Sequence, residues 1–296
     1  MAEASICIVS KDRKEELFKT LCILKKYLNT VCEIHVFLDN CTDNSASLKQ
    51  DFPEVIWYES SKQIGPSRAR HRLFNEAKGD YIFGFDDDAH PLNADFIKKA
   101  IHIFQHEPDL AVLSFEELKG IFNNDAEALK FHVPEQQFYC NAFTGCGFAV
   151  RKSAYQQIKG FPEWMDIYGE EACVSIQFIE KGFKICYTSA ISVNHRVNRE
   201  HRRTGGSNAF RFEKQLCHAG MYFLIYYPIF LIPKKLFKLF WHNLVKYAFT
   251  DWRFFKGYCM GKLCLWINLP KALKNRHAVS LKTVKSINTL PPPKYG

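Results

Sequence analysis

Short apolar runs alternate with segments of helical periodicity through the first 115 residues. Five runs have the length and composition of buried strands, at residues 5–10, 33–38, 55–58, 81–85 and 110–115. Apolar residues at helical spacing lie between them, for example at residues 67–77 and 94–106. This alternation predicts an α/β fold with a Rossmann-like, mostly parallel sheet flanked by helices. Ligands bind at the carboxyl ends of such strands, so the polar residues there are the candidates for a site.

Charge divides the chain into two parts. The net charge is +9, but residues 201–296 hold 17 basic residues against two acidic ones, whereas residues 1–200 have a small acidic excess. We therefore expect a catalytic or binding domain over residues 1–205 and a basic, aromatic helical extension over residues 206–296. The apolar fraction of 47% excludes disorder for the bulk of the chain.

The extension invites two interpretations. Its longest apolar run, residues 221–233, is too short to span a membrane. The next segment carries an apolar stripe interleaved with lysines, made of Leu236, Phe237, Phe240, Trp241 and Leu244. That composition is typical of a helix lying on an anionic membrane surface, but also of a helix that packs its stripe on the rest of the protein. Nucleic acid is not favoured as a partner, because no groove-reading motif accompanies the basic residues.

Cysteine usage bears on the compartment. The eleven cysteines form no Cys-x-x-Cys pair, and several lie inside apolar runs. This pattern predicts reduced, core-filling thiols in a cytoplasmic protein. The first residues lack the basic and apolar regions of a signal peptide. Together with the basic extension, these features favour a peripheral position on the inner face of the cell membrane.

Three consecutive aspartates, Asp86, Asp87 and Asp88, follow the apolar run at residues 81–85 directly. Carboxylates this close raise one another's pKa values or recruit a cation. Side chains two residues apart on an extended chain project to the same side, so Asp86 and Asp88 can share one ion. Hard oxygen ligands suit Mg²⁺ or Mn²⁺. A solvated acidic turn is the alternative, but the position at a strand end favours a metal site.

Several segments together resemble the motifs of family 2 glycosyltransferases, which have the GT-A fold. In the longest, a turn and helix from Gly65 lead through Gly79-Asp-Tyr-Ile to the acidic triplet, where the family has its metal-binding Asp-x-Asp. The others are residues 10–13, the loop at residues 36–45, residues 144–147, Gly160-Phe161, residues 168–171 and residues 193–195. The resemblance covers about residues 5–200.

This resemblance implies a metal-dependent, inverting transfer of a sugar from a nucleoside diphosphate sugar to an acceptor hydroxyl. Asp86, Asp88 and His195 would hold the divalent ion, with Asp88 the more direct ligand. Asp39 would contact the base of the nucleotide. The full set expected at the donor is Ser10, Asp12, Arg13, Asp39, Gly65, Arg70 and Asp87.

The acidic pair Glu170 and Glu171 would supply the base that deprotonates the acceptor. The family places its base at the second position, which favours Glu171, although aspartate is commoner there. Two glutamates at a helix start are also favoured by the helix dipole alone. Thr144, Gly145 and Trp164 would lie on the acceptor side. The acceptor would be a carbohydrate or a lipid-linked glycan, in surface polysaccharide or glycolipid assembly.

Other readings remain open at this point. A nucleotidyltransferase acting on a sugar phosphate shares a similar sheet and metal, but the residues after the first strand lack the glycine-rich triphosphate loop it usually needs. A non-catalytic, membrane-associated protein that binds nucleotide sugars is the second alternative. The basic loop with Arg196, Arg199, Arg202 and Arg203 either closes over the donor or is a solvated linker. Residues 121–137, polar and weakly periodic, predict a surface excursion.

Overall fold

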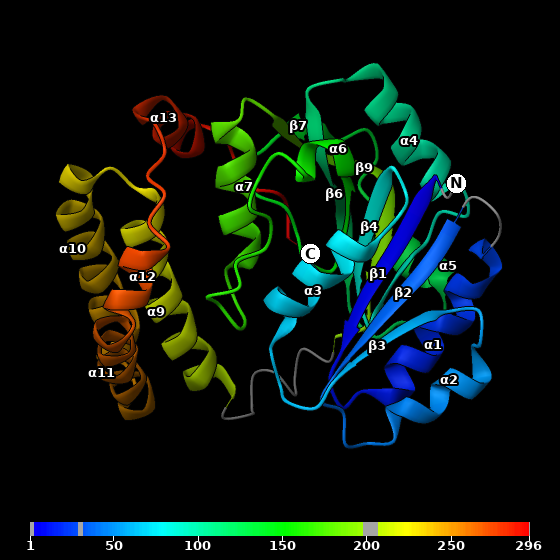
Figure 1. Cartoon of the computed structure of the whole chain (residues 1–296), viewed down its shortest axis with the longest axis horizontal. Coiled ribbons are helices and arrows are strands. Elements are labelled where there is room, and N and C mark those ends of the chain that lie inside the picture. The colour runs from blue at the N-terminus through cyan, green and yellow to red at the C-terminus, as the bar shows by residue number, and fades with distance from the viewer. Residues whose placement is uncertain (1–2, 29–31, 198–206, 296) are drawn as a thin grey trace.

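The computed structural model describes residues 3–28, 32–197 and 207–295 (Figure 1). Within these residues a single sheet contains nine strands in the order β3-β2-β1-β4-β8-β6-β9-β5, with β7 pairing β9. The strands are β1 (Ala4–Ser10), β2 (Cys32–Asp39), β3 (Ile56–Ser60), β4 (Tyr81–Asp86), β5 (Ala89–Pro91), β6 (Leu110–Lys119), β7 (Gln137–Tyr139), β8 (Gly147–Arg151) and β9 (Lys184–His195).

The sheet is mixed, and most of its longer strands run parallel to one another. Strands β3, β2, β1 and β4 run parallel, as do β6 and β9, and β8 lies antiparallel between β4 and β6. The predicted α/β fold is therefore confirmed. The sequence predicts a last strand over residues 183–187 followed by a link to residues 193–195, but β9 does not stop near Tyr187. It passes an irregularity in its pairing with β6 and continues to His195, where it also pairs β5.

Helices cover both faces of the sheet (Figure 1). The main ones are α1 (Lys14–Leu24), α3 (Pro66–Glu76), α4 (Phe96–His106), α7 (Glu170–Glu180), α9 (Ser207–Tyr226), α10 (Ile232–Asn243) and α11 (Trp252–Ile267). Shorter ones are α2 (Leu48–Asp51), α5 (Asp125–Leu129), α6 (Lys152–Tyr155), α12 (Leu269–Lys274) and α13 (Leu281–Thr289). Leucines and phenylalanines of α1 and α4 fill the core on one face, and residues of α3 and α7 fill it on the other.

The helices from α9 onward pack beside α7 and away from the sheet (Figure 1). One apolar cluster joins Trp164, Cys173 and Ile176 to α9 residues such as Met221. A second cluster, with Phe212 and Tyr258 at its centre, lies wholly within the helical region. The helical region therefore has some core of its own and also shares one with the α/β part.

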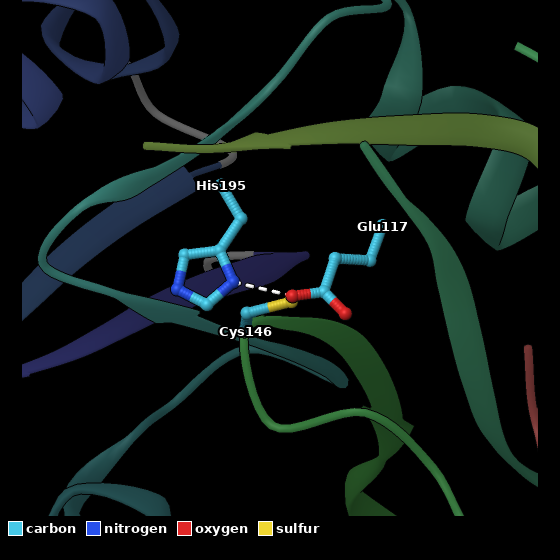
Figure 2. Close-up of side chains that lie close together, drawn as sticks. All are labelled: Glu117, Cys146 and His195. Carbon is cyan, nitrogen blue, oxygen red and sulfur yellow. Dashed lines mark hydrogen bonds and ion pairs between the residues drawn. The ribbon is translucent and has the colours of Figure 1, made fainter. Parts of the chain in front are cut away.

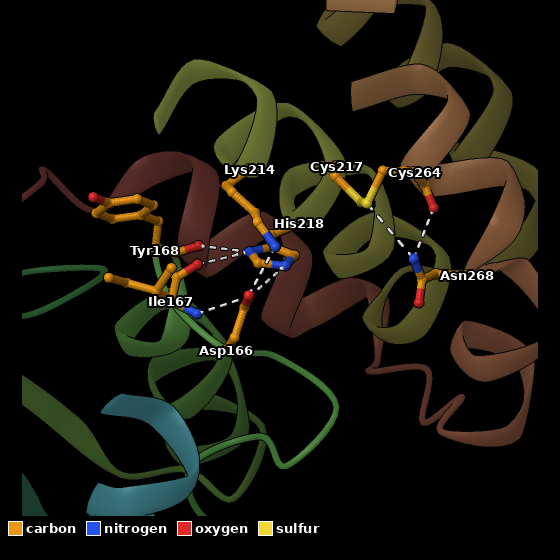
Figure 3. The surroundings of a disulfide bond; sticks show 8 residues. All are labelled: Asp166, Ile167, Tyr168, Lys214, Cys217, His218, Cys264 and Asn268. Carbon is orange, nitrogen blue, oxygen red and sulfur yellow. Dashed lines mark hydrogen bonds and ion pairs between the residues drawn. A yellow bond between two sulfur atoms is a disulfide. The ribbon is translucent and has the colours of Figure 1, made fainter. Parts of the chain in front are cut away.

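The expectation of reduced thiols is wrong at one place. A disulfide joins Cys217 on α9 to Cys264 on α11, two helices that pack together with a Cα–Cα separation of 5.8 Å. Sequence spacing could not reveal this pair, because the two cysteines are 47 residues apart. Close by, Lys214 and His218 on α9 reach Asp166, which attaches the helical region to the loop before α7 (Figure 3).

The apolar side chains predicted to form one stripe within residues 234–249 lie on two different faces. Leu236 and Phe240 on α10 pack against the helical core, whereas Phe237 and Trp241 are exposed. The helix therefore uses one side for packing and leaves an aromatic side to solvent. No helix in the described ranges is long and apolar enough to cross a membrane.

Candidate active site

The acidic triplet lies where the sequence places it, between the end of β4 and the start of β5. Its three members have different surroundings. Asp87 is buried, accepts a 2.7 Å hydrogen bond from the Ser10 hydroxyl and pairs with Arg13 at 3.1 Å. Burial, together with nearby carboxylates, raises the pKa of Asp87 to about 7. Asp87, Ser10 and Arg13 thus connect the ends of β1 and β4 to each other.

Asp86 and Asp88 converge with His195, and their nearest ligand atoms all lie within 4.8 Å of one another. One oxygen of Asp88, Oδ1, is buried without a hydrogen-bond donor and lies 3.3 Å from the Nε2 atom of His195. The other oxygen pairs with Arg13 at 2.6 Å. Two carboxylates and one imidazole at this spacing, with a buried oxygen lacking a donor, fit a divalent metal ion.

A third carboxylate orients the histidine. Glu117, near the end of β6, accepts a hydrogen bond from the Nδ1 atom of His195 (Figure 2). This leaves Nε2 facing Asp86 and Asp88. Ligating histidines commonly donate their second ring nitrogen to a carboxylate in this way. Cys146 lies beside the pair, but burial raises the pKa of its thiol to about 12, which disfavours it as a ligand. Glu117 was not among the site residues predicted from the sequence, although a pair of glutamates at the end of an apolar run could have indicated a polar group at a strand end.

Arg70 on α3 lies at the centre of the acidic groups. Its Nη2 atom lies 2.6 Å from Asp86 and 2.9 Å from the carbonyl oxygen of Gly145. Its Nη1 atom lies 3.2 Å from Glu171 and 3.4 Å from Glu170. A Cβ atom at Gly145 would come within 2.2 Å of the Glu171 carboxylate, so glycine makes this approach possible. Arg70 thus joins the metal-type cluster to the acidic pair.

The acidic pair begins helix α7, as predicted, and its two carboxylates differ in access. The Glu170 side chain is 5% exposed and one of its oxygens has no hydrogen-bond partner, whereas the Glu171 side chain is 22% exposed. Burial and the neighbouring Glu171 raise the pKa of Glu170 to about 8. Burial also raises the pKa of Glu171, and Arg70 opposes the rise.

The residues expected at the nucleotide lie at the ends of β1 and β2. Asp39 is buried and accepts hydrogen bonds from the backbone N–H groups of Ile64 and Gly65, at 2.7 and 2.9 Å. Gly65 has a φ of 85° and lies against the backbone of Asp166, so a side chain would be excluded there. Asp12 is exposed and bonds the backbone of Thr42. Asp39 therefore holds the turn before α3 in place.

Two residues expected at the acceptor lie in the interior. Thr144 is buried, and its hydroxyl lies 3.1 Å from that of Ser114. Trp164 is buried in the cluster between the α/β part and the helical region, so its ring is not available to stack on a sugar in this structure. Arg196 pairs with Glu16 at 2.7 Å, which argues for a structural role. Arg199, Arg202 and Arg203 lie outside the described residues.

The model of glycosyl transferase family 2 matches residues 5–161, more than half of the chain. The chain belongs to glycosyl transferase family 2. Membership settles the enzyme class as a glycosyltransferase, against the nucleotidyltransferase and the non-catalytic binding protein. An uncharacterized protein of Haemophilus influenzae is 23% identical over 176 residues, which cover 53% of this chain and 92% of that one.

Solved structures support the GT-A fold of this family 2 glycosyltransferase. The mannosyltransferase PcManGT from Pyrobaculum calidifontis, solved with GDP-Man and Mn²⁺, has a TM-score of 0.59 and 13% identity over 97% of this chain and 79% of that one. S. aureus TarS 1–349, solved with UDP-GlcNAc, has a TM-score of 0.58 and 15% identity over 93% and 89% of the two chains. GalNAc-T7, solved with UDP, GalNAc and Mn²⁺, has a TM-score of 0.60 and 15% identity over 99% and 59%.

Proposed function

We propose that this glycosyltransferase moves a sugar from a nucleoside diphosphate sugar to an acceptor hydroxyl with inversion, using a divalent ion at Asp86, Asp88 and His195. The observation that carries the proposal is that Arg70 contacts both the metal side and the acceptor side of the site. One guanidinium contacts Asp86 on the metal side at 2.6 Å and Glu171 on the acceptor side at 3.2 Å. An ion site and a base this close can act on the two ends of one transferred sugar.

Glu171 is the proposed base, because it is the more accessible member of the acidic pair. It accepts the proton of the acceptor hydroxyl while that oxygen bonds to the anomeric carbon and the bond to the diphosphate breaks. Attack opposite the departing diphosphate inverts the anomeric centre. A divalent ion bound at the aspartates would stabilise the charge that develops on the departing diphosphate. Mn²⁺ and Mg²⁺ both suit the ligands.

The nucleotide is proposed to lie over the ends of β1 and β2, near Asp12 and Asp39. Support comes from the strand order, in which β1 and then β2 follow β4, the strand that leads to the metal-side aspartates, and from the similar structures solved with GDP-Man or UDP-GlcNAc. Asp39 keeps the turn at Gly65 in place through two backbone hydrogen bonds. Its contribution to nucleotide binding is therefore at least partly to position that turn.

Calorimetry with UDP- and GDP-sugars, with and without Mn²⁺, tests the donor half of the proposal. We expect nucleotide binding that requires Mn²⁺ and is lost in Asp88→Asn. Glu171→Gln should keep that binding and lose transfer, and Glu163→Gln, an exposed glutamate in the same loop region, should keep both. Unchanged transfer in Glu171→Gln would refute the base, and product of retained anomeric configuration by NMR would refute inversion.

We also propose that the helical region binds an anionic membrane surface. Phe237, Trp241 and Val245 lie four residues apart and line one shallow hollow with Lys238 and Lys246. Further large apolar side chains of the helical region are exposed, namely Ile229, Phe230, Phe249, Trp252, Trp266 and Ile267. Aromatic side chains flanked by lysines suit the interface of an anionic bilayer. A position on the inner face of the cell membrane and a role in surface polysaccharide or glycolipid assembly remain predictions.

Sedimentation with vesicles tests this second proposal. The protein should sediment with vesicles that contain phosphatidylglycerol and less with pure phosphatidylcholine. Replacing both Phe237 and Trp241 by serine should weaken sedimentation. Phe18→Ser, an exposed aromatic on α1 of the α/β part, is the control. Equal sedimentation of all three proteins would contradict the proposed surface.

A further inference from the structure

A cavity of about 600 Å³ lies beside the candidate active site. It begins at Glu117, which contacts His195, and continues along the residues that follow β6. In the sheet, β4 and β8 separate β6 from β1, so the cavity lies across the metal cluster from the ends of β1 and β2. Because the nucleotide is proposed to lie over those two strands, the cavity is on the side left for the acceptor.

The wall of this cavity is unusually apolar for a surface. Ile121, Phe131 and Val133 line it, and Ile121 and Phe131 are 69% and 63% exposed. They belong to the segment of residues 121–137 that the sequence predicted as a surface excursion. Large apolar side chains gathered around a cavity next to a reaction site mark a surface that a ligand covers. The charged residues of the lining are Glu116, Glu117, Lys119 and Lys294, and of these Glu117 contacts His195 of the metal cluster.

The last described residues complete the cavity. The side-chain amide of Asn141 donates hydrogen bonds to the carbonyl oxygens of Ile287 and Leu290, at 3.0 and 2.9 Å. Its backbone N–H donates to the carbonyl oxygen of Pro291 at 2.9 Å. The chain after α13 thereby returns to the centre of the α/β part (Figure 1), where Tyr295 lines the cavity.

Tyr295 lines the cavity together with the apolar wall and is close enough to the proposed base to sense its charge. Its ring is exposed, and it shares the cavity with Glu117. Partial burial and the nearby carboxylates of Glu171 and Glu117 raise the pKa of its hydroxyl. An exposed aromatic ring at this place can cover one face of a sugar, which the buried Trp164 cannot do.

We propose that this cavity binds the acceptor and that the acceptor is an amphiphile with an apolar chain or ring. The apolar part lies against Ile121, Phe131 and Val133, and the hydroxyl-bearing part lies under Tyr295, toward Glu171. The proposal rests on the proposed function, because it takes Glu171 as the base and the ends of β1 and β2 as the donor side. It adds the chemical class of the acceptor and a residue, Tyr295, that contacts it.

Binding of matched alkyl glycosides tests the proposal without requiring the natural acceptor. The probes are octyl and methyl glycosides of glucose, galactose and mannose, measured by calorimetry below the micelle concentration in the presence of Mn²⁺ with UDP or GDP. For at least one hexose, the octyl form should bind at least tenfold more tightly than the methyl form. The double variant Ile121→Ser and Phe131→Ser should abolish that preference. Both side chains are exposed, so the fold should be retained.

Two further variants sharpen the test. Phe18→Ser removes an exposed phenylalanine on α1, outside the cavity and the helical region, and should leave the preference unchanged. Tyr295→Ala should weaken binding of both the octyl and methyl forms, and Tyr295→Phe should restore it. Equal binding of the two forms for all three hexoses would overturn the proposal, as would loss of the preference in Phe18→Ser. These failures are distinct from failure of the proposed function, which would appear as absent Mn²⁺-dependent nucleotide binding.

Discussion

Replacing Arg70 with methionine tests how the acidic groups of this site are held together. Methionine fills similar space without the charge. The substitution removes the partner of Asp86, Glu170 and Glu171 and leaves the carbonyl oxygen of Gly145 without its donor. Breaking a buried ion pair by removing one partner costs about 3–5 kcal/mol. Asp86 and Glu171 are partly exposed and can recruit water, so we expect a loss near the lower limit, about 3 kcal/mol.

The loss should depend on pH in a defined direction. Without the guanidinium, the pKa values of the three carboxyl groups rise further above those of the unfolded chain. A carboxyl group with a raised folded-state pKa destabilises the fold as pH increases through the interval between the two values. The deficit of Arg70→Met should therefore grow with pH. It should be smaller at about pH 5.5, where these groups take up protons, than at about pH 9, above the pKa of about 8 that Glu170 has with Arg70 present.

Urea unfolding followed by circular dichroism at both pH values measures this deficit. Arg72→Met is the matched control, because Arg72 is exposed on the same helix and has ring contacts with Tyr58 and Phe37. Its effect should be within about 0.5 kcal/mol. Arg70→Lys keeps the charge but not the planar fork of the guanidinium, so its loss of stability should lie between those of Arg72→Met and Arg70→Met. A deficit below about 1 kcal/mol, or one equal at both pH values, would refute the reasoning.

Three other predictions concern catalysis and the metal. Burial raises the pKa of Glu171, so kcat should rise with pH on an acid limb that lies above the ordinary pKa range of glutamate. A kcat that is independent of pH above that ordinary range would contradict this. Gly145→Ala should displace the flexible Glu171 carboxylate and lower kcat with little change in melting temperature. Gly65→Ala, at a positive φ and against backbone, should lower the melting temperature itself, and the reverse pattern in the two alanine variants would be evidence against these roles. Glu117→Gln should weaken Mn²⁺ binding about 10- to 100-fold by calorimetry, and unchanged affinity would exclude Glu117 as a positioning residue.

Local patterns in the sequence were sufficient to predict the fold and the central residues of the site. Buried strands and amphipathic helices have periods that single segments reveal, which is why the α/β sheet was predictable. The spacing of Asp86 and Asp88 likewise predicted that their carboxylates share one side. The structure brings both to His195. The strand that carries His195 was predicted to stop too early, because its continuation depends on pairing with β5 and not on its own composition.

Other features depend on distant contacts that no local pattern encodes. Trp164 precedes the acidic pair in sequence, but its burial is set by α9 residues more than 50 positions later. Tyr295 enters the cavity only because Asn141 holds the chain after α13. The disulfide between Cys217 and Cys264 requires α9 and α11 to lie together. In each case the contact that fixes the role of the side chain comes from a residue far away in sequence, so neighbouring residues do not reveal that role.

The arrangement of cations around the carboxylates also bears on which arginine serves the donor. Arg70 was expected among the donor residues, but its guanidinium is buried and already contacts Asp86, Glu171 and the carbonyl oxygen of Gly145. Reaching the diphosphate would require Arg70 to release the acidic pair that contains the proposed base. Arg13 contacts the metal-side carboxylates while its side chain remains 41% exposed. Arg13→Met should therefore weaken nucleotide binding, and it should also lower stability, because it removes a partner of the buried Asp87 and Asp88. Equal nucleotide affinities for Arg13→Met and the unmodified protein would return the diphosphate to Arg70.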